Sequence, residues 1–259
     1  MSVNLDQVVS SLVETAPPGE LSQVSSDLST ILDVSQSTIN KSIQKQVDDK
    51  GTIISGNLIA SKWNKQPGST KYIDYVNKSL FNVDYASRKA IDIEDYDPET
   101  TYPPYFNDLV DKLEAYGQDH YPSAFAYSVI PGDEPQLLII GEKVSPENFY
   151  TGCWNSHYRI QNGAINGVVT IDVHYYEDGN VRLNFEEEVS QSILGHDDIV
   201  NAINKIETSL SLKLVHSFNE LNEKTFKSLR RLLPVTRSKV NWGSAIGNYR
   251  LGSDVVNKK

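Results

Sequence analysis

The chain has 259 residues, of which 39% are hydrophobic and 22% are charged, as is ordinary for a globular protein. Its single cysteine, Cys153, excludes an intrachain disulfide and a metal site built from several cysteines. There is no apolar run of roughly 18 residues, and residues 1–6 lack the pattern of a secretory signal. We therefore expect a cytoplasmic protein that does not span a membrane.

The charge is distributed unevenly along the chain. The net charge is −10 overall, but residues 224–259 contain nine Lys or Arg and one Asp, which makes this segment +8 and leaves −18 on residues 1–223. This asymmetry indicates an acidic body that presents a basic arm to an acidic partner or surface.

Residues 1–50 are predicted to form a helical domain. Apolar residues recur at helical spacing in three segments between residues 3 and 47, and Ala16-Pro17-Pro18-Gly19 separates the first two. Short connections favour an antiparallel bundle. Each helix is too short to be stable alone, so we expect the three to pack on one another or on a partner.

Residues 51–120 are predicted to contain short strands, loops and one connecting helix. The apolar periodicity from Phe106 to Tyr116 predicts a helix that ends near Gly117. The acidic residues between Asp92 and Asp97 lack the ligand spacing and the Gly of a calcium loop, so we interpret this segment as a solvated loop. The strands are expected at residues 52–54, 72–76 and 80–83.

Between residues 121 and 190 the hydrophobic period changes to two, which is typical of strands. Consecutive strands with turn residues between them predict an antiparallel meander. We expect five strands, at residues 124–130, 136–143, 149–160, 168–177 and 181–188, with a turn at 162–167.

The last hairpin of this sheet can be predicted in more detail. Odd-numbered residues carry the apolar side chains of both strands, and these share one face only if the loop has an odd number of residues. Glu177-Asp178-Gly179, with Gly179 left-handed, is such a loop. The opposite face, with Thr170, Asp172, His174 and Tyr176, is semi-polar and can accept a second layer such as the first helices.

One long helix is predicted over residues 197–233, and Pro234 ends it. Residues 196–233 are assigned to this helix as a segment of the fold. At ~1.5 Å per residue it would span roughly 55 Å, more than one domain core needs. We expect it to cover the apolar face of the sheet or to lie against a partner. Its apolar stripe consists of Ile199, Ile203, Ile206, Leu210, Leu214, Phe218 and Leu221.

The C-terminal segment, residues 234–259, carries a short apolar stripe. Trp242, Ala245, Ile246 and Tyr249 fall at helical spacing, but two glycines inside the stripe weaken the helix, so it forms best when docked. Two interpretations remain open. Either the segment is a flexible arm that binds a partner with Trp242 as its anchor, or Trp242 and Ile246 pack on the protein's own surface.

Two motifs indicate a family. The segments VHYYEDGNV, residues 173–181, and LRRLLPVTRSKVNW, residues 229–242, resemble the alpha subunit of F-actin capping protein. Shorter matches occur in the same order, so the resemblance covers nearly the whole chain, and several substitutions look fungal. They are APPGE at residues 16–20, DHY at 119–121 and NFYTGCWNSHY at 148–158.

The resemblance implies an α+β fold that is one half of a pseudo-symmetric, obligate heterodimer. In this family the alpha subunit pairs with a beta subunit of similar fold, and the two five-stranded meander sheets join edge to edge. One long helix from each subunit covers the joined sheet, and the N-terminal antiparallel helix bundle forms a stalk. The basic, amphipathic C-terminal segment, here residues 234–259, is a flexible tentacle.

The resemblance also implies a function. The family caps the barbed ends of actin filaments independently of calcium and blocks the addition and loss of subunits there. It is not an enzyme and needs no cofactor or metal. We would expect such a protein in the cytoplasm and cytoskeleton, at cortical actin patches if it is fungal, together with capping-protein regulators.

The resemblance places actin binding at the end of the long helix and in the C-terminal segment. Positive groups there speed encounter with an acidic target and strengthen binding. Polyphosphoinositides inhibit the family through an overlapping patch, which here is Lys227, Arg231 and Arg237. The predicted actin-binding residues are Lys227, Arg230, Arg231, Arg237, Lys239, Trp242, Ile246 and Tyr249.

Other function classes fit the sequence less well. Carboxylates at Glu177, Asp178 and Glu186–Glu188 resemble catalytic pairs, but we place the first two in a turn and the others at a solvated strand end. The five histidines have no metal-ligand spacing, and no phosphate-binding Gly loop occurs. An adaptor that binds phosphoinositides or nucleic acid through the basic arm is the alternative, although a body at −18 repels nucleic acid.

Overall fold

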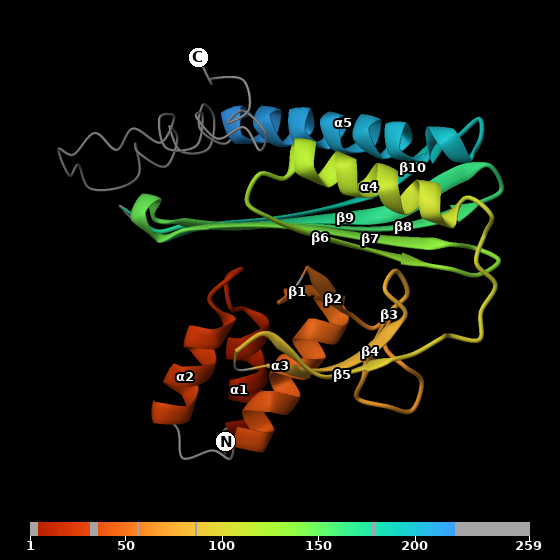
Figure 1. Ribbon diagram of the computed structural model, residues 1–259. Coiled ribbons are helices and arrows are strands. Elements are labelled where there is room, and N and C mark those ends of the chain that lie inside the picture. The colour runs from red at the N-terminus through yellow and green to blue at the C-terminus, as the bar shows by residue number, and fades with distance from the viewer. Residues whose placement is uncertain (1–4, 32–35, 56, 86, 178–179, 221–259) are drawn as a thin grey trace.

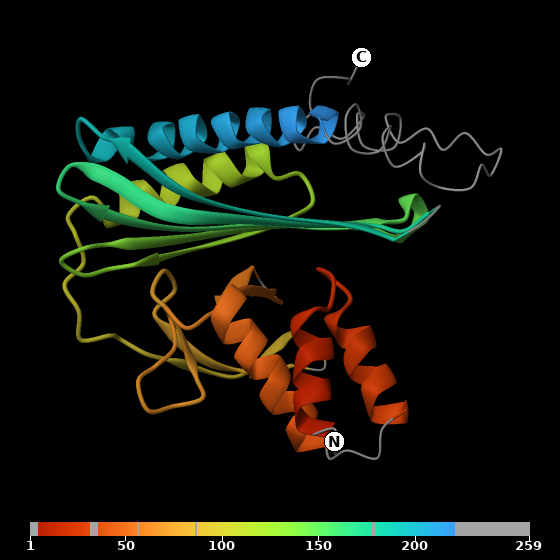
Figure 2. The same cartoon turned by 180° about the vertical axis from the view of Figure 1, so that it is seen from behind.

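The computed structural model describes residues 5–31, 36–55, 57–85, 87–177 and 180–220. A large sheet divides this part of the chain into two sides (Figure 1). Two helices cover one side of the sheet, and the N-terminal helices with two small sheets lie on the other, as the view from behind also shows (Figure 2).

Three helices form the N-terminal part: α1 (Leu5–Glu14), α2 (Leu21–Ile31) and α3 (Gln36–Lys50). They alternate in direction, which confirms the predicted antiparallel bundle (Figure 1). Each is amphipathic, and the buried residues of all three meet in one cluster with Tyr72 and Phe81 of the small sheets. Packing on one another, not intrinsic helix propensity, therefore stabilises these short helices.

Two small sheets follow the N-terminal helices in the chain. The hairpin of β1 (Thr52–Ile54) and β2 (Leu58–Ala60) is separate from the three-stranded sheet of β3 (Tyr72–Asp74), β4 (Ser79–Asp84) and β5 (Lys89–Asp95). The predicted strands at 52–54, 72–76 and 80–83 are found here, whereas β2 and β5 were not predicted.

The interpretation of the segment from Asp92 to Asp97 as a loop is wrong for its first part. These acidic residues are solvated, but the chain up to Asp95 pairs with β4 as the edge strand β5. Nearly every residue of β5 is exposed, so the sequence carries no buried alternation that would reveal a strand. Glu94 and Asp97 are bound by Lys71 and Lys78 at 2.7 and 2.8 Å.

The large sheet is the predicted five-stranded antiparallel meander, with strand order β10-β9-β8-β7-β6. The hairpin prediction is confirmed in its register, because Val181 lies opposite Tyr175 and Phe185 opposite Ile171, so the apolar side chains share one face. The position of Gly179 lies outside the described residues. The strands are β6 (Ala124–Ile130), β7 (Gln136–Ser145), β8 (Tyr150–Gln161), β9 (Ala164–Tyr175) and β10 (Val181–Ser192).

Three strands, β7, β9 and β10, are longer than predicted. The turn expected at 162–167 is only Asn162 and Gly163, both with positive φ, so β9 begins at Ala164 instead of at residue 168. Asn-Gly is the preferred sequence for such a two-residue hairpin turn. Gly167 is therefore a strand residue, and the carbonyl oxygen of His157 lies so close that a Cβ on Gly167 would be 2.2 Å from it.

Two helices cover the apolar face of the sheet: α4 (Phe106–His120) and α5 (Ile199–Glu220), which follows a short 3₁₀ turn (His196–Asp198). The long helix was expected to cover this face, and the structure adds α4 beside it (Figure 1). The apolar stripe of α5 is buried against β8, β9 and α4. The predicted continuation to residue 233 lies outside the described residues. None of the described helices combines the length and the hydropathy needed to cross a membrane.

The close approach at Gly167 yields the first prediction. We expect Gly167→Ala to lower the free energy of unfolding by about 1–3 kcal/mol, because the added Cβ must push two strands apart at backbone atoms. Gly152→Ala on β8 is the matched control, since its Cβ would meet nothing nearer than 3.7 Å. Urea unfolding measures both, and equal stability of the two variants would contradict the prediction.

Candidate functional site

The residues predicted to bind actin follow α5 directly in the chain. All eight, Lys227, Arg230, Arg231, Arg237, Lys239, Trp242, Ile246 and Tyr249, lie outside the described residues. The structure does describe the body that carries them: how α5 is fixed to the sheet, how the N-terminal helices are attached below, and which sheet edge is open.

A buried carboxylate fixes α5 to the layer beneath it. Glu207 lies on the apolar face of α5 and is only 7% exposed. Its Oε2 accepts hydrogen bonds from the hydroxyls of Tyr116 and Tyr121, both at 2.7 Å. The Tyr158 hydroxyl lies 3.4 Å from Oε1. One side chain thus links α5 to α4, to the residue that follows α4, and to β8.

Burial sets the ionisation of this cluster. Desolvation raises the pKa of Glu207 to about 7, although the three tyrosine hydroxyls and Ser156 oppose the shift by hydrogen bonding to the carboxylate. Burial, with the Glu207 carboxylate nearby, raises the pKa values of Tyr116, Tyr121 and Tyr158 above the usual range. The tyrosines therefore stay protonated and act as donors, and the carboxyl group is the part of the cluster that titrates near neutral pH.

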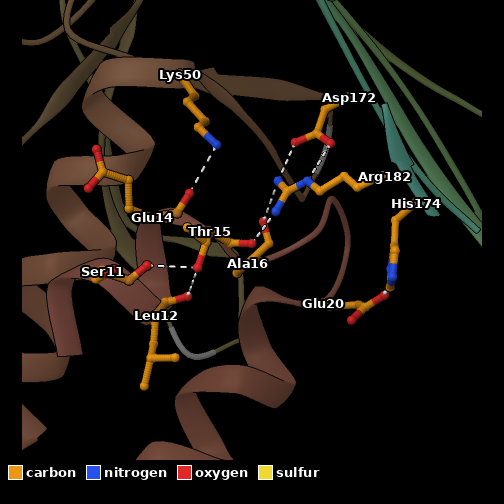
Figure 3. Close-up of polar contacts among 10 residues, drawn as sticks. All are labelled: Ser11, Leu12, Glu14, Thr15, Ala16, Glu20, Lys50, Asp172, His174 and Arg182. Carbon is orange, nitrogen blue, oxygen red and sulfur yellow. Dashed lines mark hydrogen bonds and ion pairs between the residues drawn. The ribbon is translucent and has the colours of Figure 1, made fainter. Parts of the chain in front are cut away.

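On the opposite face of the sheet, Arg182 of β10 attaches the N-terminal helices. Its guanidinium forms a fork with Asp172 of β9, with Nε–Oδ1 at 3.0 Å and Nη2–Oδ2 at 2.6 Å (Figure 3). The same group donates to the carbonyl oxygens of Thr15 and Ala16 in the turn between α1 and α2. The guanidinium thus donates hydrogen bonds to one carboxylate and two carbonyl oxygens at once, which its planar arrangement of N–H groups allows.

A second contact lies beside the first. His174 Nδ1 lies 3.1 Å from Glu20 Oε1 (Figure 3). Its Nε2 lies 2.7 Å from Asn180 Oδ1. The APPGE segment at residues 16–20 thus meets the VHYYEDGNV segment at residues 173–181. This confirms the expectation that the N-terminal helices meet the semi-polar face, and it gives two of the matched motifs a shared structural role.

The outer edge of β10 has no strand beside it in the described residues. β10 is 12 residues long, and most of its residues are half-buried or exposed. The other edge strand, β6, has 7 residues, and Ile59 of β2 packs against its lower face. β10 is thus the longer edge and the better template for pairing with another chain.

The described residues contain no group of three His, Cys, Asp or Glu placed to hold a metal ion. Cys153 on β8 is half-buried and packs against a small apolar cluster formed by β2, β6 and β7. Desolvation raises the pKa of its thiol, so the thiol stays protonated.

Comparison with known proteins decides the family. The sequence profile described as "F-actin capping protein alpha subunit" matches residues 9–254. The chain belongs to this family. As a capping protein alpha subunit it binds the barbed ends of actin filaments, partners a beta subunit and is not an enzyme.

Individual relatives agree with this family. The chain is 56% identical to the F-actin-capping protein subunit alpha of Debaryomyces hansenii, covering 100% of this chain and 99% of that protein. It is 38% identical to the corresponding subunit of Saccharomyces cerevisiae, with coverage of 100% and 99%. These relatives are yeast proteins, as the fungal resemblance predicts.

One solved structure confirms the fold. The homodimeric actin capping protein alpha subunit from Plasmodium berghei superposes with a TM-score of 0.69 at 24% identity. The match covers 90% of this chain and 98% of that one. The capping protein alpha fold predicted from the sequence is therefore the fold that the described residues adopt.

Sequence reasoning missed Glu207 and Arg182. Glu207 was identifiable in principle, because it stands four residues from Ile203 and three from Leu210, inside the apolar stripe of α5. An acid at such a position needs several donors, and the sequence does not reveal which tyrosines supply them. Arg182 follows the VHYYEDGNV motif but was not singled out.

The Glu207 cluster makes stability depend on pH. The folded-state pKa of about 7 lies above the ordinary 4.5, so the protonated carboxyl stabilises the fold at low pH, and this contribution is lost as pH rises from about 4.5 to 7. Glu207→Gln does not titrate. We expect its stability relative to wild type to improve by about 3 kcal/mol between pH 5 and pH 8 in urea unfolding. The same difference at both pH values would contradict the assignment.

The guanidinium fork yields a further prediction. Arg182→Lys keeps the charge but cannot bind Asp172 and both carbonyls at once, so we expect a loss of about 1–2 kcal/mol. Amide hydrogen exchange should become faster at residues 15–20. Arg159→Lys on β8, where the side chain is exposed, is the control. Unchanged protection of residues 15–20 would show that Arg182 does not hold the turn.

Proposed function

We propose that the chain caps barbed ends through the basic residues after α5 and enters an obligate heterodimer through the outer edge of β10. The match to the family over residues 9–254, which includes the LRRLLPVTRSKVNW segment, is the observation that carries this proposal. The open β10 edge supports it, because a strand of 12 residues is left without a neighbour on one side.

The charge distribution favours this division of roles. The described body belongs to the part of the chain that carries −18, whereas residues 224–259 carry +8. Clustered positive groups at one end of a long helix raise the rate of encounter with an acidic filament end, and their effect is screened by salt. Residues 1–50 then serve as a stalk and residues 234–259 as a tentacle, and capping needs neither calcium nor a cofactor.

We assign the contact to Lys227, Arg230, Arg231, Arg237 and Lys239, with Trp242, Ile246 and Tyr249 as apolar anchors. Polyphosphoinositide headgroups compete for Lys227, Arg231 and Arg237, because a cluster of cations suits either acidic surface. The expected location is the cytoplasm, at cortical actin patches, where capping-protein regulators reach the same complex.

A homodimer is the second candidate for the assembly. The Plasmodium structure is described as a homodimeric alpha subunit, and its fold matches this chain. The open β10 edge permits pairing with a second copy as well as with a beta subunit, so the fold by itself does not distinguish the two assemblies.

The actin-contact assignment is tested by the triple variant Lys227→Glu, Arg231→Glu and Arg237→Glu. In complex with a capping protein beta subunit, we expect capping affinity to fall about 100-fold, because three favourable charge contacts become repulsive. Barbed-end elongation from filament seeds gives the affinity, and gel filtration shows that the heterodimer persists.

The matched control is Lys41→Glu, Lys45→Glu and Lys89→Glu, which makes the same charge change at exposed positions on α3 and β5. This control should cap like wild type. Capping by the first triple variant at wild-type affinity would remove these residues from the actin contact. A loss of pairing with the beta subunit would instead make them structural.

A further inference from the structure

The open edge strand carries an acidic run at its centre. The segment Glu186–Glu188 was interpreted as a solvated strand end, but β10 continues to Ser192 and these residues lie in the middle of its 12 residues. All three lie opposite another strand on one side only, since β9 is the sole neighbour of β10 among the described strands.

The three carboxylates do not share one environment. Glu187 points toward the helix layer, where Lys213 of α5 binds it at 2.6 Å. Glu186 and Glu188 point to the opposite face and are exposed. Their directly opposite residues on β9 are the uncharged Thr170 and Val168, and neither forms an ion pair with a described residue, although Lys62 and Arg159 line the same surface hollow as Glu188.

This arrangement opposes self-pairing. If two copies of β10 pair antiparallel about a twofold axis perpendicular to the sheet, each face stays on its own side and even-numbered residues oppose even-numbered residues. The two registers with the longest overlap place the axis at Glu186 or at Glu187. Glu186 then lies opposite its own copy or opposite Glu188. Like charges directly across a strand pair destabilise it.

We propose that Glu186 and Glu188 select the partner of this edge. They disfavour a second copy of the chain and favour an edge strand with Lys or Arg at the two alternating positions opposite them. The proposal rests on the proposed heterodimer and deepens it, because it names the chemistry of the partner strand. It also decides between the two assemblies that the fold permits, in favour of the heterodimer.

A general role in keeping the edge soluble is the other explanation for these carboxylates. Charged residues on an exposed edge prevent non-specific pairing whatever the partner. That explanation makes no distinction between cationic and neutral partner strands. The experiments therefore measure association with partners of opposite charge as well as self-association.

The first experiment uses two copies of the full chain and no beta subunit. The variant Glu186→Lys with Glu188→Lys is mixed with differently tagged wild type, and the affinities of the three possible pairs are measured by analytical ultracentrifugation and native mass spectrometry. We expect the mixed pair to be about tenfold tighter than the wild-type pair, or more. A mixed pair no tighter than the wild-type pair would overturn the proposal.

Salt gives this experiment an internal check. Raising the ionic strength from about 0.1 M to 1 M shortens the Debye length from roughly 10 to 3 Å. The mixed pair should then weaken and the wild-type pair should tighten, so that the difference between them shrinks. If both pairs change in affinity equally with ionic strength, the role of the two carboxylates in selecting the partner is contradicted.

The second experiment measures pairing with a capping protein beta subunit. We expect the same double variant to pair at least fivefold more weakly than wild type. Asp95→Lys with Glu99→Lys, at exposed positions by the three-stranded sheet, makes the same charge change away from β10 and should pair like wild type. Equal pairing of both variants would overturn the assigned partner chemistry. If wild type itself does not pair with beta, the proposed heterodimer fails. The mixed-copy experiment still tests whether the charges of Glu186 and Glu188 govern pairing at this edge.

Discussion

The two-residue alternation of the five-stranded sheet determines where the other elements lie. Odd-numbered residues of β9 and β10 form an apolar face that must be buried, and α4 and α5 bury it. Even-numbered residues form a face with charges and hydroxyls, which only a polar partner layer can satisfy. The turn between α1 and α2 supplies that layer. A register shift by one residue would exchange the two faces, and both attachments would be lost.

On each face, a partly or fully buried polar side chain joins the sheet to the layer packed on it. Above the sheet, Glu207 takes hydrogen bonds from tyrosines of α4 and β8 and ties α5 into the apolar core. Below it, Arg182 bridges Asp172 and the carbonyls of the α1–α2 turn. Buried polar groups of this kind are costly unless all their partners are in place, so they fix one arrangement of the layers. The segment proposed to bind actin therefore follows a helix that is held at a defined position.

Much of the fold could be predicted because it depends on local sequence patterns. Five strands, three N-terminal helices, α4 and the start of α5 follow from periodicity and turn residues, and the hairpin register follows from the apolar face.

The features that the sequence did not reveal have physical causes. β5 is exposed throughout, so it has no buried face to produce a pattern. Gly167 was interpreted as a turn residue, whereas it lies in β9, and it is a glycine there because the backbone of His157 leaves no room for a Cβ. Glu207 and Arg182 depend on partners distant in sequence, and the residues predicted to bind actin lie outside the described part of the chain.

The central claim is that this chain caps filaments as one half of a heterodimer. The most direct measurement is the elongation of actin from filament seeds, with this chain alone and with the chain co-expressed with a capping protein beta subunit. The account predicts that the pair stops barbed-end growth and that the single chain does not. A pair that forms but leaves growth unchanged, or a single chain that stops growth without beta, would contradict it.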